Sequence, residues 1–165
     1  MGQLNLGNGA NFVGGTGGYL SDAPAGTILQ KVSLKGNTSF SSTSQSYVQS
    51  PVYVTITPRS ATSELLVEQC VSSWIGTGGY NFRQIRATGG YTNSDCATYG
   101  DFYDYGSSTY MTVPLTALIQ NHNTTSAITF RTWGKGGGSG TWYWPNNNSA
   151  TMSYKYIMTC TEIAT

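Results

Sequence analysis

From residue 27 to the end of the chain, apolar and polar residues alternate in short runs separated by Gly, Ser, Asn and Pro. In the run 80–86, even-numbered residues such as Phe82 fall on one side, and Arg83 and Ile85 fall on the other. A period of two predicts a strand with one buried face. The run 64–75 is more continuously apolar, which predicts a central strand.

Runs of this kind recur at roughly ten-residue spacing, which is typical of sandwiches and jelly rolls. The glycine run 136–140 predicts a long hairpin loop, and 93–108 is rich in loop-forming residues. We therefore expect an all-β fold, a single antiparallel β-sandwich of jelly-roll type with about eight strands. The predicted strands are 27–35, 52–57, 64–75, 80–86, 110–119, 127–133, 141–144 and 152–162.

The first 26 residues differ in composition, because they hold too many glycines to form a regular element alone. They also carry large apolar side chains, among them Leu4, Leu6, Phe12 and Val13. A flexible linker would lack such groups, whereas a disordered tail is the ordinary state of a terminus. We expect an extended docking arm at 1–26 that orders against a partner or a neighbouring subunit, followed by the sandwich at 27–165.

Charged residues make up 9% of the chain, against roughly a quarter in an average soluble domain. The net charge is +1 and the eight basic residues are scattered, so a nucleic-acid partner is not expected. No apolar run is long enough for a membrane span or a signal peptide. We expect folding in a reducing bacterial cytoplasm and no membrane association.

The three cysteines, Cys70, Cys96 and Cys160, are an odd number without metal-binding or redox spacing. We expect buried free thiols in strands.

Candidate catalytic groups are few. His122, the one histidine, stands in a polar loop and is expected to be a solvated turn residue. Asp95, Asp101 and Asp104 cluster, but their spacing matches no calcium loop, so solvated loop acids are expected. Glu64 and Glu68 share one face of a strand and predict a polar surface or a subunit contact. We expect no enzyme, no cofactor and no metal.

The aromatic residues are the strongest candidates for recognition. Rigid rings among small polar residues are typical of binding surfaces, but they also suit packing in the core or between subunits. The candidate recognition or subunit-contact residues are Tyr91, Tyr99, Phe102, Tyr103, Tyr105 and Tyr110, together with Trp142 and Trp144.

Three stretches carry a resemblance: AGTILQ at 25–30, VTITPRSATSELLV at 54–67 and YIMTCTEIA at 156–164, with a Ser/Thr-rich segment at 37–50. Over residues 25–165 the chain resembles a virion-surface module common in cyanophages and other aquatic bacteriophages. The resemblance implies a β-sandwich on the virion surface, often trimeric, found at tail-fibre tips and in short stand-alone virion proteins.

No fibre shaft precedes the module in this sequence. We therefore expect a head-decoration (cement) protein, a homotrimer docked on the major capsid protein through its arm. The alternative is a short tail fibre or tail appendage that binds a tail or baseplate protein and a host surface glycan. A free-standing carbohydrate-binding protein and an unrecognised enzyme are the remaining possibilities.

Overall fold

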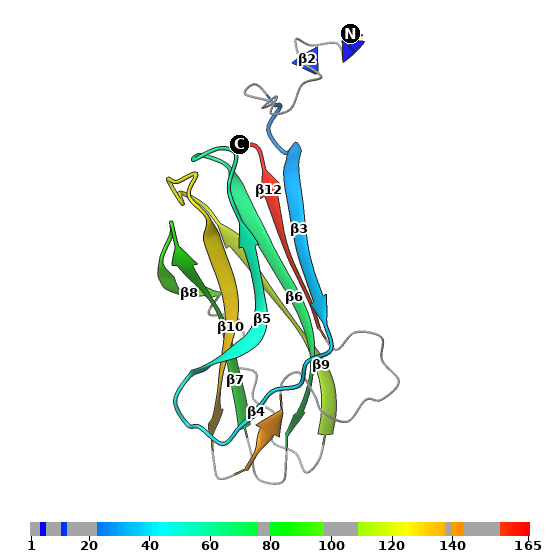
Figure 1. The fold of residues 1–165 in the computed structure, drawn as a ribbon, viewed down its shortest axis with the longest axis vertical. Coiled ribbons are helices and arrows are strands. Elements are labelled where there is room, and N and C mark those ends of the chain that lie inside the picture. Colours follow the sequence, from blue (N-terminus) through cyan, green and yellow to red (C-terminus); the bar gives the residue numbers. More distant parts are fainter. Residues whose placement is uncertain are drawn as a thin grey trace.

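The structure, a computed structural model, describes residues 4–5, 11–12, 23–75, 80–97, 109–137, 140–143 and 156–165. All the elements within these ranges are strands (Figure 1). They are β1 (Leu4–Asn5), β2 (Asn11–Phe12), β3 (Ile28–Gly36), β4 (Ser41–Ser42), β5 (Val48–Ile56), β6 (Glu64–Ile75), β7 (Tyr80–Gly89), β8 (Asn93–Ala97), β9 (Thr109–Ile119), β10 (Ile128–Gly137), β11 (Trp142–Tyr143) and β12 (Tyr156–Ile163).

The eight longer strands form two antiparallel sheets that face each other (Figure 1). One sheet has the order β3-β12-β6-β9; past the end of β12 the short strand β11 pairs with β6, and β4 pairs with β11. The other has the order β5-β10-β7-β8. We call them the β6 sheet and the β10 sheet.

The strand order is that of a jelly roll. Numbered along the chain, the eight longer strands lie in the orders 1-8-3-6 and 2-7-4-5. The antiparallel pairs 4-5, 3-6, 2-7 and 1-8 are nested, as in one long hairpin that has been rolled into two sheets. This is the double Greek key of the jelly roll, and it confirms the all-β sandwich predicted from the sequence.

Alternating side chains of both sheets fill the space between them. Along β10 the burial alternates strictly between buried and half-buried, which is the period-two pattern of a strand with one face on the core. The core holds Val52, Val54, Ile56, Leu65, Val67, Val71, Ile85, Ala87, Leu115, Ala117, Ile119, Ile128, Phe130, Trp142, Tyr156, Met158 and Cys160.

Three sequence-based expectations about local structure are wrong. Residues 93–97 form strand β8 rather than loop, because β7 offers them an edge on which to pair. The run 136–140 is not wholly a loop, since β10 continues through Gly137. Cys70 is exposed on the outer side of β6, whereas Cys160 is a buried free thiol as expected.

The N-terminal strands β1 and β2 pair only with each other, in a separate two-stranded sheet. Their register places Leu4 opposite Phe12. Two of the four residues expected to form the docking arm are thus brought opposite each other, and the other two, Leu6 and Val13, lie outside the described residues.

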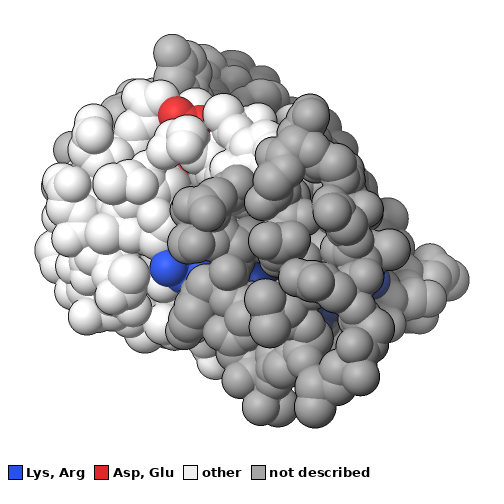
Figure 2. Space-filling view, turned by 90° about the horizontal axis from the view of Figure 1, so that it is seen from above, with Lys and Arg blue, Asp and Glu red and all other residues white. Residues whose placement is uncertain are grey.

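Charge is sparse on the described surface, and most of what Figure 2 shows of it is uncharged. Glu64 and Glu68 lie on the outer side of the β6 sheet, as the sequence predicts for a polar surface. Glu64 is half-buried and Glu68 is exposed. No described helix is long and apolar enough to cross a membrane.

Candidate functional site

A buried carboxylate, Glu162, joins three segments at one end of the sandwich. It belongs to the last strand, β12, and its side chain is fully buried. Its Oε1 accepts hydrogen bonds from the backbone N–H groups of Arg59 (2.8 Å) and Ser60 (2.9 Å) and from the Ser63 hydroxyl (2.7 Å). Its Oε2 accepts from the Gln30 amide on β3 at 2.6 Å.

Burial by itself would raise the pKa of Glu162, since a low dielectric disfavours the charged form. Hydrogen bonds from Arg59, Gln30, Ser60 and Ser63 stabilise the carboxylate more, and hold its pKa below its ordinary value. Burial, and secondarily the Glu162 charge, raise the pKa of the neighbouring Cys160 thiol to about 12. Cys160 is therefore a neutral, inert core residue at neutral pH.

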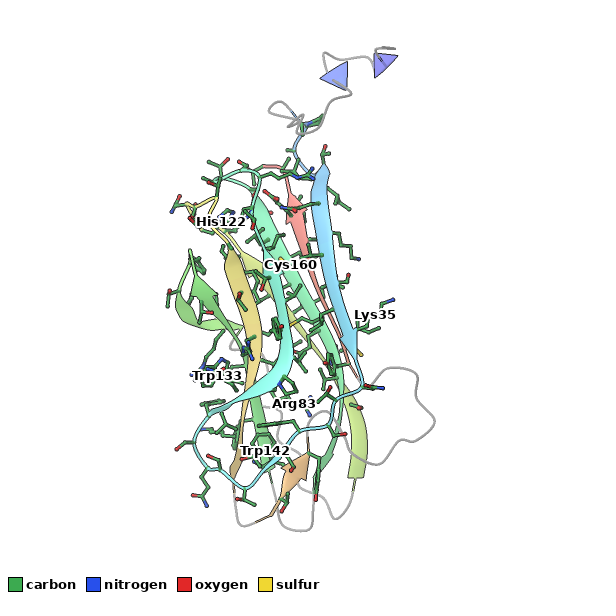
Figure 3. The ribbon with its side chains drawn as sticks, in the orientation of Figure 1. Lys35, Arg83, His122, Trp133, Trp142 and Cys160 are labelled. Carbon is green, nitrogen blue, oxygen red and sulfur yellow. The ribbon has the colours of Figure 1, made fainter. Side chains whose placement is uncertain are left out.

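His122 lies beside this carboxylate network and is 3% exposed, so the expectation of a solvated turn residue is wrong. Its neighbours Asn121 and Asn123 both have positive φ, 56° and 52°, which asparagine tolerates better than most residues. The histidine Nδ1 is 3.0 Å from the Thr124 carbonyl oxygen and its Nε2 is 3.3 Å from the Ser63 hydroxyl. These contacts hold the imidazole inward (Figure 3).

Ser63, His122 and Glu162 are residue types of a hydrolytic triad, but they are in the wrong order for one. In a triad the histidine lies between the serine and the acid, so that it can take the serine proton. Here the serine lies between the other two, and its hydroxyl donates a hydrogen bond to Glu162. Ser63 is also only 1% exposed. The arrangement links the loop after β5, the loop after β9 and strand β12 by hydrogen bonds.

A second polar region lies inside the other half of the sandwich, where Arg83 is 1% exposed (Figure 3). Burial lowers the pKa of its guanidinium to about 9, which leaves it charged at neutral pH. Also in the interior, the buried Thr132 hydroxyl on β10 donates to the Gln69 side-chain oxygen on β6, and it is 3.4 Å from the Val52 carbonyl oxygen on β5. Buried polar side chains of the two sheets therefore contact each other in the interior.

Trp142, a candidate for a recognition or subunit-contact surface, lies in the core, which is the packing alternative that the sequence left open. The side chain is 1% exposed and belongs to the core. Its ring makes an edge-on contact with Phe40, with centroids 5.8 Å apart, and its indole N–H donates to the Ser44 carbonyl at 3.4 Å. Space for the indole exists because residue 136, which faces it from β10, is a glycine.

The other predicted recognition residues are placed only in part. Tyr91 is half-buried, packs against the core and accepts a hydrogen bond from the Asn93 amide at 3.2 Å. Tyr110 is opposite Trp74 in the register of β9 and β6. Outside the described residues lie Tyr99, Phe102, Tyr103, Tyr105, Trp144, Asp101 and Asp104. Within the described part, no group of acids, histidines and cysteines could hold a metal ion.

The most distinctive described surface lies on the outer side of the β10 sheet, and its residues are scattered in the sequence. Three cations stand over aromatic rings there. The Arg86 guanidinium lies 4.8 Å from the Tyr47 ring centroid and 4.7 Å from that of Trp133. Arg131 lies 4.5 Å from the Tyr53 ring.

Lys135 completes this surface, with its ammonium 4.8 Å from the rings of both Tyr47 and Phe82. We call these seven residues the cation–aromatic face: Tyr47, Tyr53, Phe82, Arg86, Arg131, Trp133 and Lys135. Figure 3 shows Trp133 on the outer side of the β10 sheet, with Lys35 on the opposite side of the molecule.

Comparison with known proteins adds a distant structural similarity. No protein-family model matches the chain, and no curated protein matches it. Among solved structures, the chain is similar to one titled "Structure of infectious bursal disease virus Gx strain", with 15% sequence identity and a TM-score of 0.36. The match covers 82% of this chain and 37% of that chain, and at this similarity it carries no functional inference.

Proposed function

We propose that the protein is a non-enzymatic structural protein on the surface of a bacteriophage virion, assembled in the host cytoplasm. The observation that carries the proposal is the nested jelly-roll order of the two sheets, because jelly rolls recur in viral capsid and lectin domains. The sequence resemblance to phage virion modules supports the same class. The packed interior and the inverted order of Ser63, His122 and Glu162 favour a structural role over catalysis.

Within this class we propose a head-decoration protein that docks on the major capsid protein through the arm at residues 1–26. The arm holds Leu4, Leu6, Phe12 and Val13 among many glycines. Burying each such side chain is worth roughly 1.5–3 kcal/mol at best, while ordering the backbone costs about 1–2 kcal/mol per residue. Docking therefore becomes favourable where the partner also supplies backbone hydrogen bonds, for example by adding the arm to a sheet edge.

Deleting residues 1–20 is expected to leave the sandwich folded but to prevent incorporation into particles, because β3 begins only at Ile28. Circular dichroism checks the fold, and the number of copies per purified virion measures incorporation. For the full-length protein we expect hundreds of copies, as for a head component. Full incorporation of the truncated protein would contradict arm docking.

A tail appendage is the second candidate function, and the cation–aromatic face favours it. A cluster of rings and cations on an open sheet face suits recognition of a molecule outside the particle. The number of copies per virion also distinguishes a head-decoration protein from a tail appendage, because a tail component would be present in a few dozen copies or fewer.

We further propose that the protein is a homotrimer that associates through the outer side of the β6 sheet. Exposed apolar side chains lie there, with Leu118 51% exposed and Ile157 39% exposed. The register places Leu118 opposite Leu66, and Ile157 opposite Cys70. Exposed apolar area of this kind is often an interaction surface, and closed symmetry is the common form of oligomers.

Light scattering of the full-length protein at micromolar concentration is expected to give the mass of three chains. Leu118→Asp is expected to shift the mass toward one chain, because it would bury an unpaired charge in the contact. Thr55→Asp, on the exposed outer side of the other sheet, is the matched control and should leave the mass unchanged. A monomer mass for the unmodified protein would contradict the proposal.

A further inference from the structure

The cation–aromatic face has a charge arrangement that is unfavourable in the protein alone. Along β10 and β7, Arg131 is directly opposite Arg86 in the register. Like charges directly opposite each other across two strands destabilise a sheet. Among the side chains described on this face, none is a carboxylate that would offset them.

Aromatic rings hold these cations in place. Arg86 lies against Tyr47 and Trp133, and Lys135 against Tyr47 and Phe82, so one tyrosine ring touches two cations. Trp133 and the three cations are all half-buried. Rings fix the position of a cation without neutralising it, so the positive charge remains available to a ligand.

Hydrogen-bond donors also remain available on both arginines. Arg86 donates from Nε and Nη2 to the Gln84 side-chain oxygen, at 3.2 and 3.0 Å. Arg131 donates from Nη1 to the Ser50 carbonyl at 3.2 Å, at the point where the register of β5 and β10 shifts. Each guanidinium has five N–H donors, so both can still bind an oxyanion.

The residues around the cations are neutral hydrogen-bonding groups. Thr129 is opposite both Thr55 and Thr88, and Trp133 is opposite both Gln84 and Gln49. Arg131 and Lys135 are four residues apart on one strand, which separates their backbones by about 13 Å. An extended ligand with repeated negative charges and many hydroxyl groups fits these features better than a single small anion.

We propose that the cation–aromatic face binds an acidic polysaccharide, with Arg86 and Arg131 pairing with its carboxylate or sulfate groups. Hydroxyl groups of the sugars would bond to the threonine side chains and to Gln49, and Tyr53, 41% exposed, adds its phenol hydroxyl. A single nucleic-acid strand would need free ring faces for base stacking, but cations already cover these rings.

Binding of the full-length protein to polygalacturonate, dextran sulfate and neutral dextran tests the proposal by calorimetry at low and at physiological salt. We expect binding to at least one of the two acidic polymers and none to dextran. Polygalacturonate and dextran sulfate distinguish carboxylate from sulfate recognition. The double variant Arg86→Gln/Arg131→Gln is expected to bind roughly tenfold more weakly or worse.

The double variant Lys31→Gln/Lys35→Gln is the matched control, because it removes the same charge from exposed positions on β3, in the other sheet. Its affinity should stay within about twofold, since exposed charges distant from the ligand are largely screened. Arg131→Gln alone preserves the contact of Arg86 with its two rings. This single variant replaces the double variant in the binding measurement if the double variant folds poorly. Melting curves of all variants check the fold.

Several results would overturn the proposal. These are binding to neither acidic polymer, equal losses in the two double variants, and tighter binding to single-stranded DNA that the same arginines control. Normal polysaccharide affinity in a protein absent from virions would contradict only the proposed virion function. Failure of the arginine variants to enter particles, without polysaccharide binding by the unmodified protein, would reassign the face to a virion partner.

Discussion

Replacing Glu162 with glutamine is expected to lower the free energy of unfolding at neutral pH by about 2–3 kcal/mol. The variant keeps the shape of the side chain but removes the charge, and hydrogen bonds to a charged group contribute about 1.5–3 kcal/mol. Its new N–H group would face donors that now point at the carboxylate, among them the Arg59 N–H and the Gln30 amide. Urea denaturation of the two proteins measures the difference.

The effect of Glu162→Gln should depend on pH in a defined direction. The pKa of Glu162 is lower in the folded protein than in the unfolded chain, where it is near the ordinary value of about 4.3. Its contribution is therefore fully present above that pH, and is lost as the pH falls through the lowered folded value. The stability difference between the two proteins should be constant near neutral pH and should shrink as the pH falls below about 4.3.

Glu68→Gln is the matched control, because Glu68 is exposed on the outer side of β6. It should change the free energy of unfolding by less than about 0.5 kcal/mol, as surface substitutions usually do. Equal effects of the two substitutions, or a Glu162→Gln effect that is the same at every pH, would show that the carboxylate network does not stabilise the fold.

The two main motifs of the sequence resemblance meet at this carboxylate. Arg59, Ser60 and Ser63 belong to the motif at 54–67, and Glu162 belongs to the motif at 156–164. They are about 100 residues apart in the chain and in direct contact in the fold. The motifs therefore specify how the last strand joins the loop after β5, which explains why they indicate the fold better than the function.

Much of the fold could be predicted because the period of two is a local signal. The strand at 64–75 was predicted with the bounds that β6 has, and the alternation at 80–86 was confirmed in β7. The five residues of β8 were missed because Asn93, Ser94 and Asp95 are not typical of strands. Their pairing depends on the edge of β7, which no local pattern reveals.

The cation–aromatic face could not be recognised as a cluster because its residues come from three separate parts of the chain. Tyr47 and Tyr53 precede and belong to β5, Phe82 and Arg86 are on β7, and the remaining three are on β10. Basic residues that look scattered in the sequence are brought together by sheet pairing. A partial signal existed, since the outward positions of β10 read Thr, Arg, Trp and Lys in turn.

The placement of Trp142 could not be predicted from the sequence either. Trp142 and Trp144 share a face if the strand is regular, and the sequence alone could assign that face either to the core or to a surface. The decision depends on residue 136, whose glycine was interpreted as part of a loop because it opens the glycine-rich run 136–140. A Cβ at that position would lie 2.6 Å from the Trp142 Cδ1 atom and 2.8 Å from its Nε1.

Trp142→Ala is expected to lower the free energy of unfolding by about 3–5 kcal/mol, because it leaves a cavity where a fully buried indole packs against Phe40. Gly136→Ala is expected to cost about 1–3 kcal/mol by overpacking the same place. Ile28→Ala, at a position 62% exposed, is the control and should cost far less than Trp142→Ala.

The double variant Gly136→Ala/Trp142→Ala distinguishes this packing from two independent defects. Removal of the indole relieves the clash of the added methyl group, which then occupies part of the cavity. The double variant should therefore be no less stable than Trp142→Ala alone, although each single substitution destabilises the protein. Residues in contact show such non-additivity, whereas independent sites add within about 0.3–0.5 kcal/mol. Strictly additive losses in urea denaturation would mean that residue 136 does not pack against the indole, and that Trp142 is available for contacts outside the core.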